Sequence, residues 1–176
     1  MGVELQLAYD RLDDVQALFA EYTTVIAGQR ADVATCLASQ HYEEELQNLE
    51  GKYGLPGGRL YLAYLDGDCA GCGALTRNSP QYAELKRLYV RPRFRGRQIG
   101  RRLVEQLLAD ATGAGYLGVR LDTFPFMESA IRLYECCGFT RIGAYNDNPI
   151  ADAVFMERPL FLQEPDRNGG KWGYTL

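Results

Sequence analysis

The spacing of hydrophobic positions near the start of the chain predicts one strand followed by two helices. Apolar residues alternate with polar ones from Val3 to Ala8, which is typical of a half-buried strand. From Asp10 to Ile26 they recur at helical spacing, as on the buried face of a helix. We expect a second, more polar helix between Ala31 and Asn48, before the break made by Gly54-Leu55-Pro56-Gly57-Gly58.

Alternation returns after that break and predicts three more strands. Arg59 to Leu65 and Ala70 to Thr76 are expected to form a hairpin across an Asp-Gly-Asp turn. The fourth strand of the chain runs from Tyr82 to Val90. Its apolar phase shifts between Leu85 and Leu88, as a β-bulge would cause.

The second half of the chain continues the alternation of helices and strands. A helix after Gly100 ends near Gly113 and Gly115. With 176 residues and 47% apolar content, the chain can bury one substantial core, and its alternating helices and strands predict a single α/β domain. The later elements are expected at Val119 to Asp122, around Tyr134, near Arg141 to Tyr145 and from Ala153 to Pro159.

Composition and charge narrow the class of protein. The net charge is −4 although the middle of the chain is strongly basic, so general binding to DNA or RNA is not expected. We find no apolar run of membrane-spanning length and no signal segment. Five cysteines, an odd number, favour a reducing compartment, and we expect a cytoplasmic protein.

The cysteines and the single histidine suggest no metal site. Cys69 and Cys72 have the C-x-x-C spacing of redox or zinc sites, but on a strand this spacing directs the thiols to opposite faces, and no second pair completes four zinc ligands. Cys136 and Cys137 are expected to fill the core, and a covalent role as nucleophiles stays open. His41 lacks neighbouring ligands, and we expect it to be exposed without a role.

The sixteen residues from Arg87 to Arg102 join a strand to a helix through a loop suited to a phosphate group. Their turn is Arg95-Gly96-Arg97-Gln98-Ile99-Gly100, and the segment holds seven arginines. The first four N–H groups of a helix have no partner within it, and the helix dipole adds roughly half a positive charge there. Gly96 and Gly100 let the backbone come close to a ligand. We therefore expect a polyanionic ligand.

The detail of this loop separates it from other glycine-rich loops. It has neither the P-loop pattern nor the dinucleotide-binding pattern. It resembles motif A of the GNAT superfamily, the acetyl-CoA-dependent N-acetyltransferases, whose loop reads Q/R-x-x-G-x-G/A. Arg95 fits the first position and Gly100 the last, whereas Gln98 stands where the middle glycine is usual. With an ordinary φ, Gln98 would still donate its backbone N–H, so we expect altered loop packing and retained pyrophosphate binding.

A second match follows the loop. Ala130-Ile131-Arg132-Leu133-Tyr134-Glu135-Cys136-Cys137-Gly138-Phe139 resembles the family pattern A-x-x-L-Y-x-x-x-G-F, and Met127 stands where the family often has an asparagine that contacts pantetheine. The resemblance covers about Val3 to Leu160. We therefore expect an acetyltransferase domain over residues 1–160 and a flexible tail over 161–176, in which Trp172 and Tyr174 could instead dock.

The resemblance implies a GNAT-like fold, with flanking helices and a central, mostly antiparallel sheet that splays between its fourth and fifth strands. It also implies acetyl-CoA as the co-substrate, with the pantetheine amides bound by the backbone of the fourth strand as an added strand would be. The residues that it implies for cofactor binding are Leu88, Tyr89, Val90, Arg95, Gly96, Arg97, Gln98, Ile99, Gly100 and Arg101.

The implied reaction is direct attack of a neutral amine on the thioester carbonyl in a ternary complex. It needs a base for the ammonium and an acid for the leaving thiolate. Tyr134 is the predicted acid, because the family places its helix beside the cofactor sulfur; packing at a helix–sheet interface is the alternative. Glu84 is the predicted base, directly or through water, by its resemblance to a strand glutamate of several family members. An ion pair with Lys86 or Arg87 is an equal alternative.

The sequence leaves the acceptor open among small polyamines, aminoglycosides, amino acids and peptide amines. Asp122 and Thr123 could touch the acceptor or cap a helix. The segment from Tyr145 to Pro149 could wall the acceptor pocket, although a surface turn is the simpler interpretation. The acids from Glu43 to Glu45 would suit a cationic acceptor, although a solvated helix face is again simpler.

Two other functions compete with the enzyme. A non-catalytic acyl-CoA-binding regulator would keep the loop but would not release thiol with any amine. A nucleic-acid-binding module would use the arginines and show strongly salt-dependent affinity. We favour the acetyltransferase with a small-molecule or peptide amine as acceptor, no nucleic-acid or membrane partner, and a homodimer left open.

Overall fold

The computed structural model describes residues 2–161 and contains one mixed sheet with helices on both faces. The predicted tail beyond Phe161, including Trp172 and Tyr174, lies outside the described residues. The strands are β1 Val3–Leu7, β2 Arg59–Leu65, β3 Asp68–Arg77, β4 Tyr82–Val90, β5 Gly118–Thr123, β6 Thr140–Ile142 and β7 Val154–Pro159. The helices are α1 Leu12–Ala27, α2 Asp32–Ser39, α3 Tyr42–Gln47, α4 Leu49–Tyr53, the short 3-10 turn Pro92–Phe94, α5 Ile99–Gly113 and α6 Glu128–Cys136.

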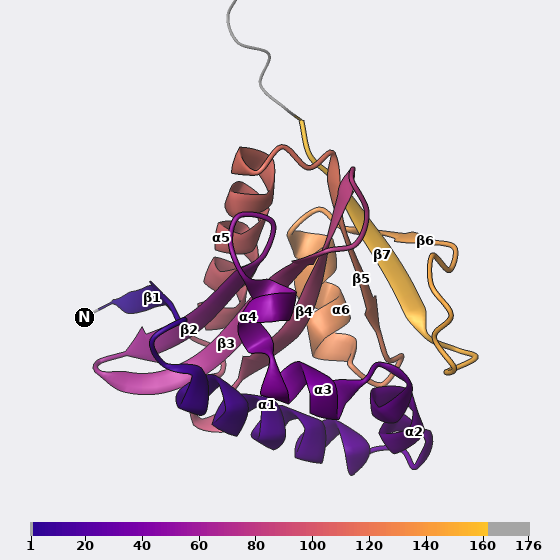
Figure 1. The fold of residues 1–176 in the computed structure, drawn as a ribbon. Coiled ribbons are helices and arrows are strands. Elements are labelled where there is room, and N and C mark those ends of the chain that lie inside the picture. Colours follow the sequence, from indigo (N-terminus) through magenta and orange to yellow (C-terminus); the bar gives the residue numbers. More distant parts are fainter. Residues whose placement is uncertain (1, 162–176) are drawn as a thin grey trace, which may run out of the picture.

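The sheet is antiparallel except at its centre. Its strand order is β1-β2-β3-β4-β5-β7-β6, and only the β4–β5 pair among these neighbours is parallel. That pair is short, because residues 82–84 of β4 face residues 118–120 of β5 and the two strands then diverge (Figure 1). The predicted splay between the fourth and fifth strands is therefore confirmed.

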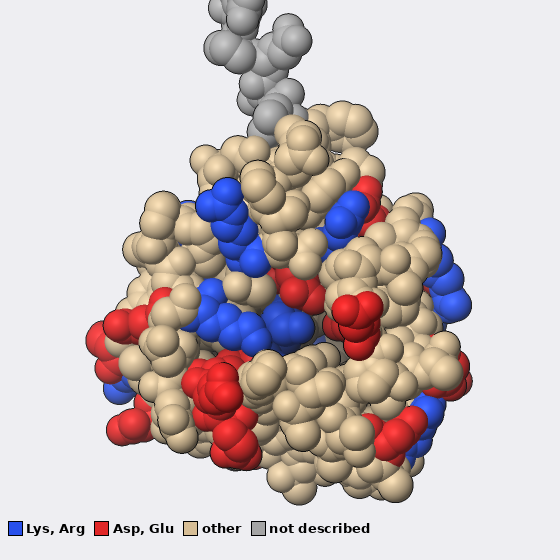
Figure 2. Space-filling view, turned by 45° about the vertical axis from the view of Figure 1, so that its right-hand side comes forward, with Lys and Arg blue, Asp and Glu red and all other residues tan. Residues whose placement is uncertain are grey.

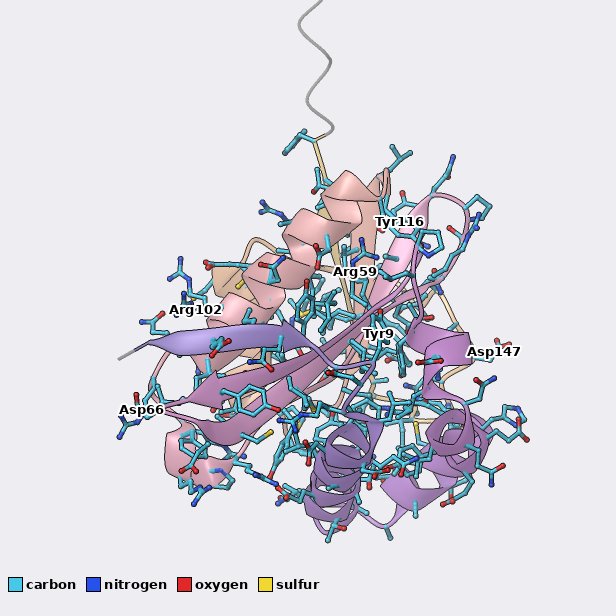
Figure 3. All side chains as sticks on the ribbon, turned by 60° about the vertical axis from the view of Figure 1, so that its left-hand side comes forward. Tyr9, Arg59, Asp66, Arg102, Tyr116 and Asp147 are labelled. Atoms are coloured by element: carbon cyan, nitrogen blue, oxygen red, sulfur yellow. The ribbon has the colours of Figure 1, made fainter. Side chains whose placement is uncertain are left out.

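The two faces of the sheet are covered by different helices (Figure 1). Helices α5 and α6 pack on one face, and α1 to α4 pack on the other. The first core includes Leu75, Leu85, Leu103, Leu107, Ile131 and Met156, and the second includes Leu18, Phe19, Ile26, Leu60, Leu62 and Tyr89. The hairpin turn at Asp66 and the loop at Asp147 lie at opposite sides of the molecule (Figure 3).

The prediction of a single polar helix between Ala31 and Asn48 is wrong, because α2 and α3 are separate helices. His41 lies between them with a φ of 55°, which is the left-handed conformation. One left-handed residue ends a right-handed helix, since the next carbonyl no longer points along the axis. A further short helix, α4, begins after Asn48, whose side chain accepts a hydrogen bond from the Gly51 N–H at 2.9 Å.

Turn chemistry explains the two features of β2 to β4 that the sequence predicted correctly. Leu65 pairs with Asp68 across Asp66 and Gly67, which have φ values of 53° and 88°, as a two-residue hairpin turn requires. The bulge in β4 is also confirmed. Cys72 faces Tyr89 and Ala74 faces Lys86, so Gly73 lies opposite two residues of β4. One of these, Arg87, has a φ of 56°.

A second bulge corrects the prediction for Cys69 and Cys72. Ala63 pairs with Gly71 and Tyr64 pairs with Cys69, so Ala70 is an extra residue in β3. The bulge shifts the side-chain alternation by one, and both cysteines pack on the core beneath α1 to α4 instead of on opposite faces. Among residues 2–161, no group of three or more His, Cys, Asp or Glu side chains is placed to hold a metal ion. No helix in that range is long and apolar enough to cross a membrane.

Candidate active site

The loop before α5 presents a row of free backbone donors. The Arg95 N–H donates to Pro92 O at 3.2 Å, and the next N–H with a carbonyl partner is that of Arg102, which donates to Gln98 O at 3.0 Å. Within the described chain, no backbone carbonyl accepts from the N–H groups of residues 96 to 101, and no side chain caps the helix. A Cβ built on Gly96 would meet nothing within 4 Å, so a ligand can approach the exposed backbone. This cradle fits a diphosphate group.

Gln98 has the backbone conformation that glycine usually supplies in this motif. Its φ is 64°, so the expectation of an ordinary φ is wrong. Gly100 is expected from the sequence to let the backbone come close to a ligand, but in the structure it has a packing role. A Cβ there would lie 3.1 Å from Leu133 Cδ2 on α6, so this glycine lets α5 and α6 pack closely.

Most of the seven arginines expected to reinforce the anion site are paired with carboxylates. Arg91 pairs with Glu21 at 2.6 Å, and Arg87 is turned away from the loop to Glu45 at 2.9 Å. Pairing cancels much of the field of each guanidinium, so the loop offers less positive charge than its sequence indicates. Arg93 and Arg101 are also paired, with Asp68 and Glu105, whereas Arg102 donates to the backbone of Val3 in the neighbouring strand β1 (Figure 3).

The β4 edge that follows the splay is the other predicted cofactor contact. Tyr89 and Val90 pair with Cys72 and Gly71 of β3, while β5 has already diverged from them. The backbone groups on the β5 side of this segment therefore have no strand partner in residues 2–161. Such an edge suits an extended chain of amides, as in pantetheine.

A cavity of about 40 Å³ lies between the diverging strands. Residues from six regions of the chain meet there, and several of them are polar. Figure 2 shows a hollow in the molecule with Lys and Arg atoms on its floor and Asp and Glu atoms near its rim. The cavity is lined by Tyr22, Ile26, Leu37, Gln40, Leu85, Lys86, Arg87, Leu88, Asp122, Thr123, Phe124, Tyr134 and Asn148.

Tyr134 lies on α6 and reaches this cavity with only 6% of its surface exposed. Burial raises the pKa of its hydroxyl above the usual value of 10.0, and the nearby Tyr22, Cys137 and Asp122 add to the effect. The group is therefore a neutral phenol at physiological pH and can donate a proton or a hydrogen bond. The structure places this predicted residue at the cavity.

Glu84 is buried on β4 but does not line the cavity. Its Oε1 accepts a hydrogen bond from the Tyr145 hydroxyl at 2.9 Å and lies 3.4 Å from Lys86 Nζ. Burial and the adjacent Glu84 raise the pKa of Tyr145, so this hydroxyl stays protonated and keeps donating. Tyr134 and Glu84 therefore do not share one cavity wall, and Glu84 as base stays a prediction.

The turn before β7 is part of the cavity wall, which corrects its interpretation as a plain surface turn. Asp122 Oδ2 accepts hydrogen bonds from Asn146 Nδ2 and Asn148 Nδ2, both at 3.0 Å. Asn148 and Asp122 both line the cavity, and neither Asp122 nor Thr123 caps α6. Sequence reasoning missed the cavity residues Tyr22, Gln40 and Lys86, because no local pattern brings these elements together.

Glu45 is a buried anion, and its assignment to a solvated helix face is wrong. It is 4% exposed and accepts hydrogen bonds from Arg87, from Lys52 at 2.6 Å and from the Tyr53 hydroxyl at 2.7 Å. Burial acts to raise the pKa of Glu45, but the hydrogen bonds and charges of Arg87 and Lys52 outweigh it and lower that pKa to about 2. Its neighbour Glu44 is exposed beside the exposed His41.

The two cysteines at the end of α6 do not line the cavity. Cys136 is exposed and Cys137 is half-buried. Burial raises the pKa of Cys137, which lowers the fraction of nucleophilic thiolate. The structure thus gives no support to a covalent role for either thiol.

Comparisons with known proteins agree with this geometry. Residues 12–139 match the family described as Acetyltransferase (GNAT) family. An uncharacterised N-acetyltransferase of Schizosaccharomyces pombe is 35% identical over 147 residues, which cover 82% of this chain and 86% of that protein. A Streptococcus agalactiae acetyltransferase has the same fold, with a TM-score of 0.73 at 22% identity over 91% of this chain and 99% of that one. A GNAT family acetyltransferase from Elizabethkingia anophelis was solved with acetyl-CoA bound. It has a TM-score of 0.52 at 23% identity, over 59% of this chain and 77% of that one.

Proposed function

The chain belongs to the acetyltransferase (GNAT) family, whose co-substrate is acetyl-CoA, and we propose that it acetylates a primary amine by direct attack in a ternary complex. One observation carries this proposal. The row of free N–H groups before α5, the open edge of β4 and the cavity that contains Tyr134 all meet at the splay between β4 and β5. A cofactor held by the N–H groups and along the β4 edge would reach the cavity.

The chain's own groups suit acetyl-CoA. The N–H groups of residues 96 to 101 would hold its pyrophosphate, and Arg95 and Arg97 would add positive charge beside it. The backbone of Leu88, Tyr89 and Val90 would bind the pantetheine amides. When bound, acetyl-CoA supplies a thioester activated toward amines.

Tyr134 is the proposed acid. It is the tyrosine of the second family motif, it lines the cavity, and its burial keeps the phenol protonated. Within the described residues, its hydroxyl has no protein hydrogen-bond partner. A hydroxyl free of protein partners can donate to a departing thiolate without first breaking a bond.

The amine must lose a proton before it attacks, since an alkylammonium has a pKa near 10.4. We propose that Asp122 receives the ammonium, because its carboxylate lines the cavity. Glu84 remains the proposed base. It would act through water, because Tyr145 and Lys86 already occupy its Oε1. The free thiols of the buried Cys36 and Cys72 suit a reducing compartment, and we propose the cytoplasm.

An acceptor panel tests the proposal directly. Acetyl-CoA and a set of amines are incubated with the protein, and released CoA thiol is measured, with binding of acetyl-CoA followed by calorimetry. We expect thiol release that depends on an amine and that falls sharply in Tyr134→Phe. Tight acetyl-CoA binding without release by any amine would instead indicate the non-catalytic acyl-CoA-binding regulator.

A further inference from the structure

The bulge in β4 gives the cavity two adjacent cations. In a regular strand, Lys86 and Arg87 would point to opposite faces of the sheet. Because Gly73 faces two residues of β4, Lys86 and Arg87 instead both line the cavity. Arg87 has the positive φ of 56° that this arrangement requires. Backbone strain at one residue thus concentrates positive charge on one wall.

The cations on this side of the cavity outnumber the carboxylates that pair with them. Within residues 2–161, Lys86, Arg87 and the adjacent Lys52 form ion pairs with Glu45 and Glu84 alone, so three cations share two anions. Arg87 donates through Nε and Nη2, and its Nη1 has no acceptor within residues 2–161. Lys86 Nζ has one acceptor at the long distance of 3.4 Å, although an ammonium has three donors.

The opposite wall carries the reverse charge. Asp122 Oδ2 is fixed by the amides of Asn146 and Asn148, and Oδ1 has no donor in the described chain. No Lys, Arg or His of residues 2–161 forms an ion pair with this carboxylate. The wall also belongs to the cavity that holds Tyr134, so its negative charge lies where the amine would be acetylated.

We infer that the acceptor carries both an amine and a carboxylate, as a free amino acid does, with the ammonium at Asp122 and the carboxylate at Lys86 and Arg87. This inference rests on the proposed acetyltransferase function. A polyamine or aminoglycoside would bring cations to a wall that already has an excess of positive charge. A carboxylate matches the planar donors of a guanidinium and the point charge of a lysine.

Matched acceptors test the inference. Each amino acid of a panel is compared with its carboxamide, which keeps the amine and side chain but removes the negative charge. Hydrogen bonds to charged groups predict that the acid is preferred by about 10-fold to 100-fold in kcat/KM for the best acceptor. Equal or faster acetylation of the carboxamides would overturn the inference while leaving the acetyltransferase function intact.

Variants assign the two ends of the acceptor. Lys86→Met should reduce the acid-to-amide ratio by about 10-fold, and Lys86→Arg should restore most of it. Asp122→Asn should instead lower kcat/KM for acids and amides alike. Arg11→Met is the matched control, because this exposed arginine pairs with Asp14 far from the cavity walls. An unchanged ratio in Lys86→Met would also count against the inference.

A binding measurement separates the inference from the proposed function. Calorimetry with CoA present, where no acetyl group can transfer, gives the affinity of each acid and amide. Tighter binding of acids that is lost in Lys86→Met supports the carboxylate site even if no amine is turned over, in which case only the catalytic proposal fails. Equal affinities for acids and amides, together with turnover of both, would sink the carboxylate site alone.

Discussion

The cofactor side and the acceptor side of the splay are built in different ways. On the proposed cofactor side, the groups that would bind acetyl-CoA lie in one continuous segment from Leu88 to Arg101, and most of them are backbone N–H and C=O groups. On the acceptor side, residues from α1, α2 and its C-cap, β4, β5, α6 and the turn before β7 form the cavity. Of its charged residues, Arg87 is buried and paired with Glu45, Lys86 lies 3.4 Å from Glu84, and Asp122 forms no ion pair within residues 2–161.

This difference determines how many residue identities each side constrains. Backbone groups are the same in every residue, so the cofactor side needs only a few positions that fix conformation, such as the left-handed Gly96 and Gln98. The acceptor side depends on which side chains meet and on their charge, so each substitution there changes the chemistry. The two sides should therefore respond to substitution in distinct ways.

The largest effect should come from Tyr134, which lies where the two sides meet. Tyr134→Phe removes one oxygen and keeps the buried ring, so turnover should fall by roughly 10² to 10⁴ while acetyl-CoA affinity stays within a few fold. Released thiol gives the rate, and calorimetry gives the affinity. Turnover within about twofold of the wild type would make Tyr134 a packing residue, and joint loss of binding and turnover would assign it to the cofactor side.

Loss of the buried charge of Glu45, beside the acceptor side, should have the largest effect on folding stability. Glu45→Gln leaves Arg87 and Lys52 without a carboxylate and should lower the free energy of unfolding by about 3 to 5 kcal/mol at pH 7. The matched control Glu44→Gln changes an exposed carboxylate and should have almost no effect. Urea unfolding gives both values. Similar losses in the two variants would contradict the buried network.

The pH dependence of this network has a definite sign. Folding lowers the pKa of Glu45 from 4.5 to about 2, so its contribution to stability is complete above about pH 4.5 and disappears as the pH falls toward 2. The stability gap between the wild type and Glu45→Gln should therefore narrow over that window. A gap that stays constant down to pH 2 would show that the charge of Glu45 is not the cause.

The sequence predicted the strands around the splay well and the buried charges of the acceptor side poorly. The splay, the hairpin turn and the bulge all follow from local spacing, because pleat and turn geometry involve neighbouring residues. The pairing of Glu45 with Arg87 joins residues 42 positions apart, and no period or motif encodes it. The single helix expected before Asn48 failed for a similar reason, since the left-handed His41 has no glycine to mark it.

A smaller effect should distinguish the two carboxylates near the cavity. Glu84→Gln keeps the shape of the side chain and removes its basicity, so the rate should fall by about 10² near pH 7 and partly recover at high pH, where the amine deprotonates unaided. Asp122→Asn should raise the KM of the amine without this recovery. A loss in Glu84→Gln that does not depend on pH would make Glu84 a structural partner of Lys86 and Tyr145.

The smallest effect concerns Gln98, where the cofactor side departs from its family motif. A left-handed residue with a Cβ costs roughly 1 to 2 kcal/mol, whereas glycine avoids this strain but loses more chain entropy on folding, by roughly 0.5 to 1 kcal/mol. Gln98→Gly should therefore raise the free energy of unfolding by about 0.5 to 1 kcal/mol, or the melting temperature by about 1 to 4 °C. Gln98→Ala is the matched control, because it removes the same amide group but keeps the Cβ and its strain. If the two variants shift the melting temperature equally, the side chain and not the backbone sets the cost, and Gln98 would have been retained for a contact of its own. If only the glycine variant gains stability, the strain comes from the left-handed backbone at position 98. Any residue with a Cβ could then take this position in the row of N–H donors at the same modest energetic cost.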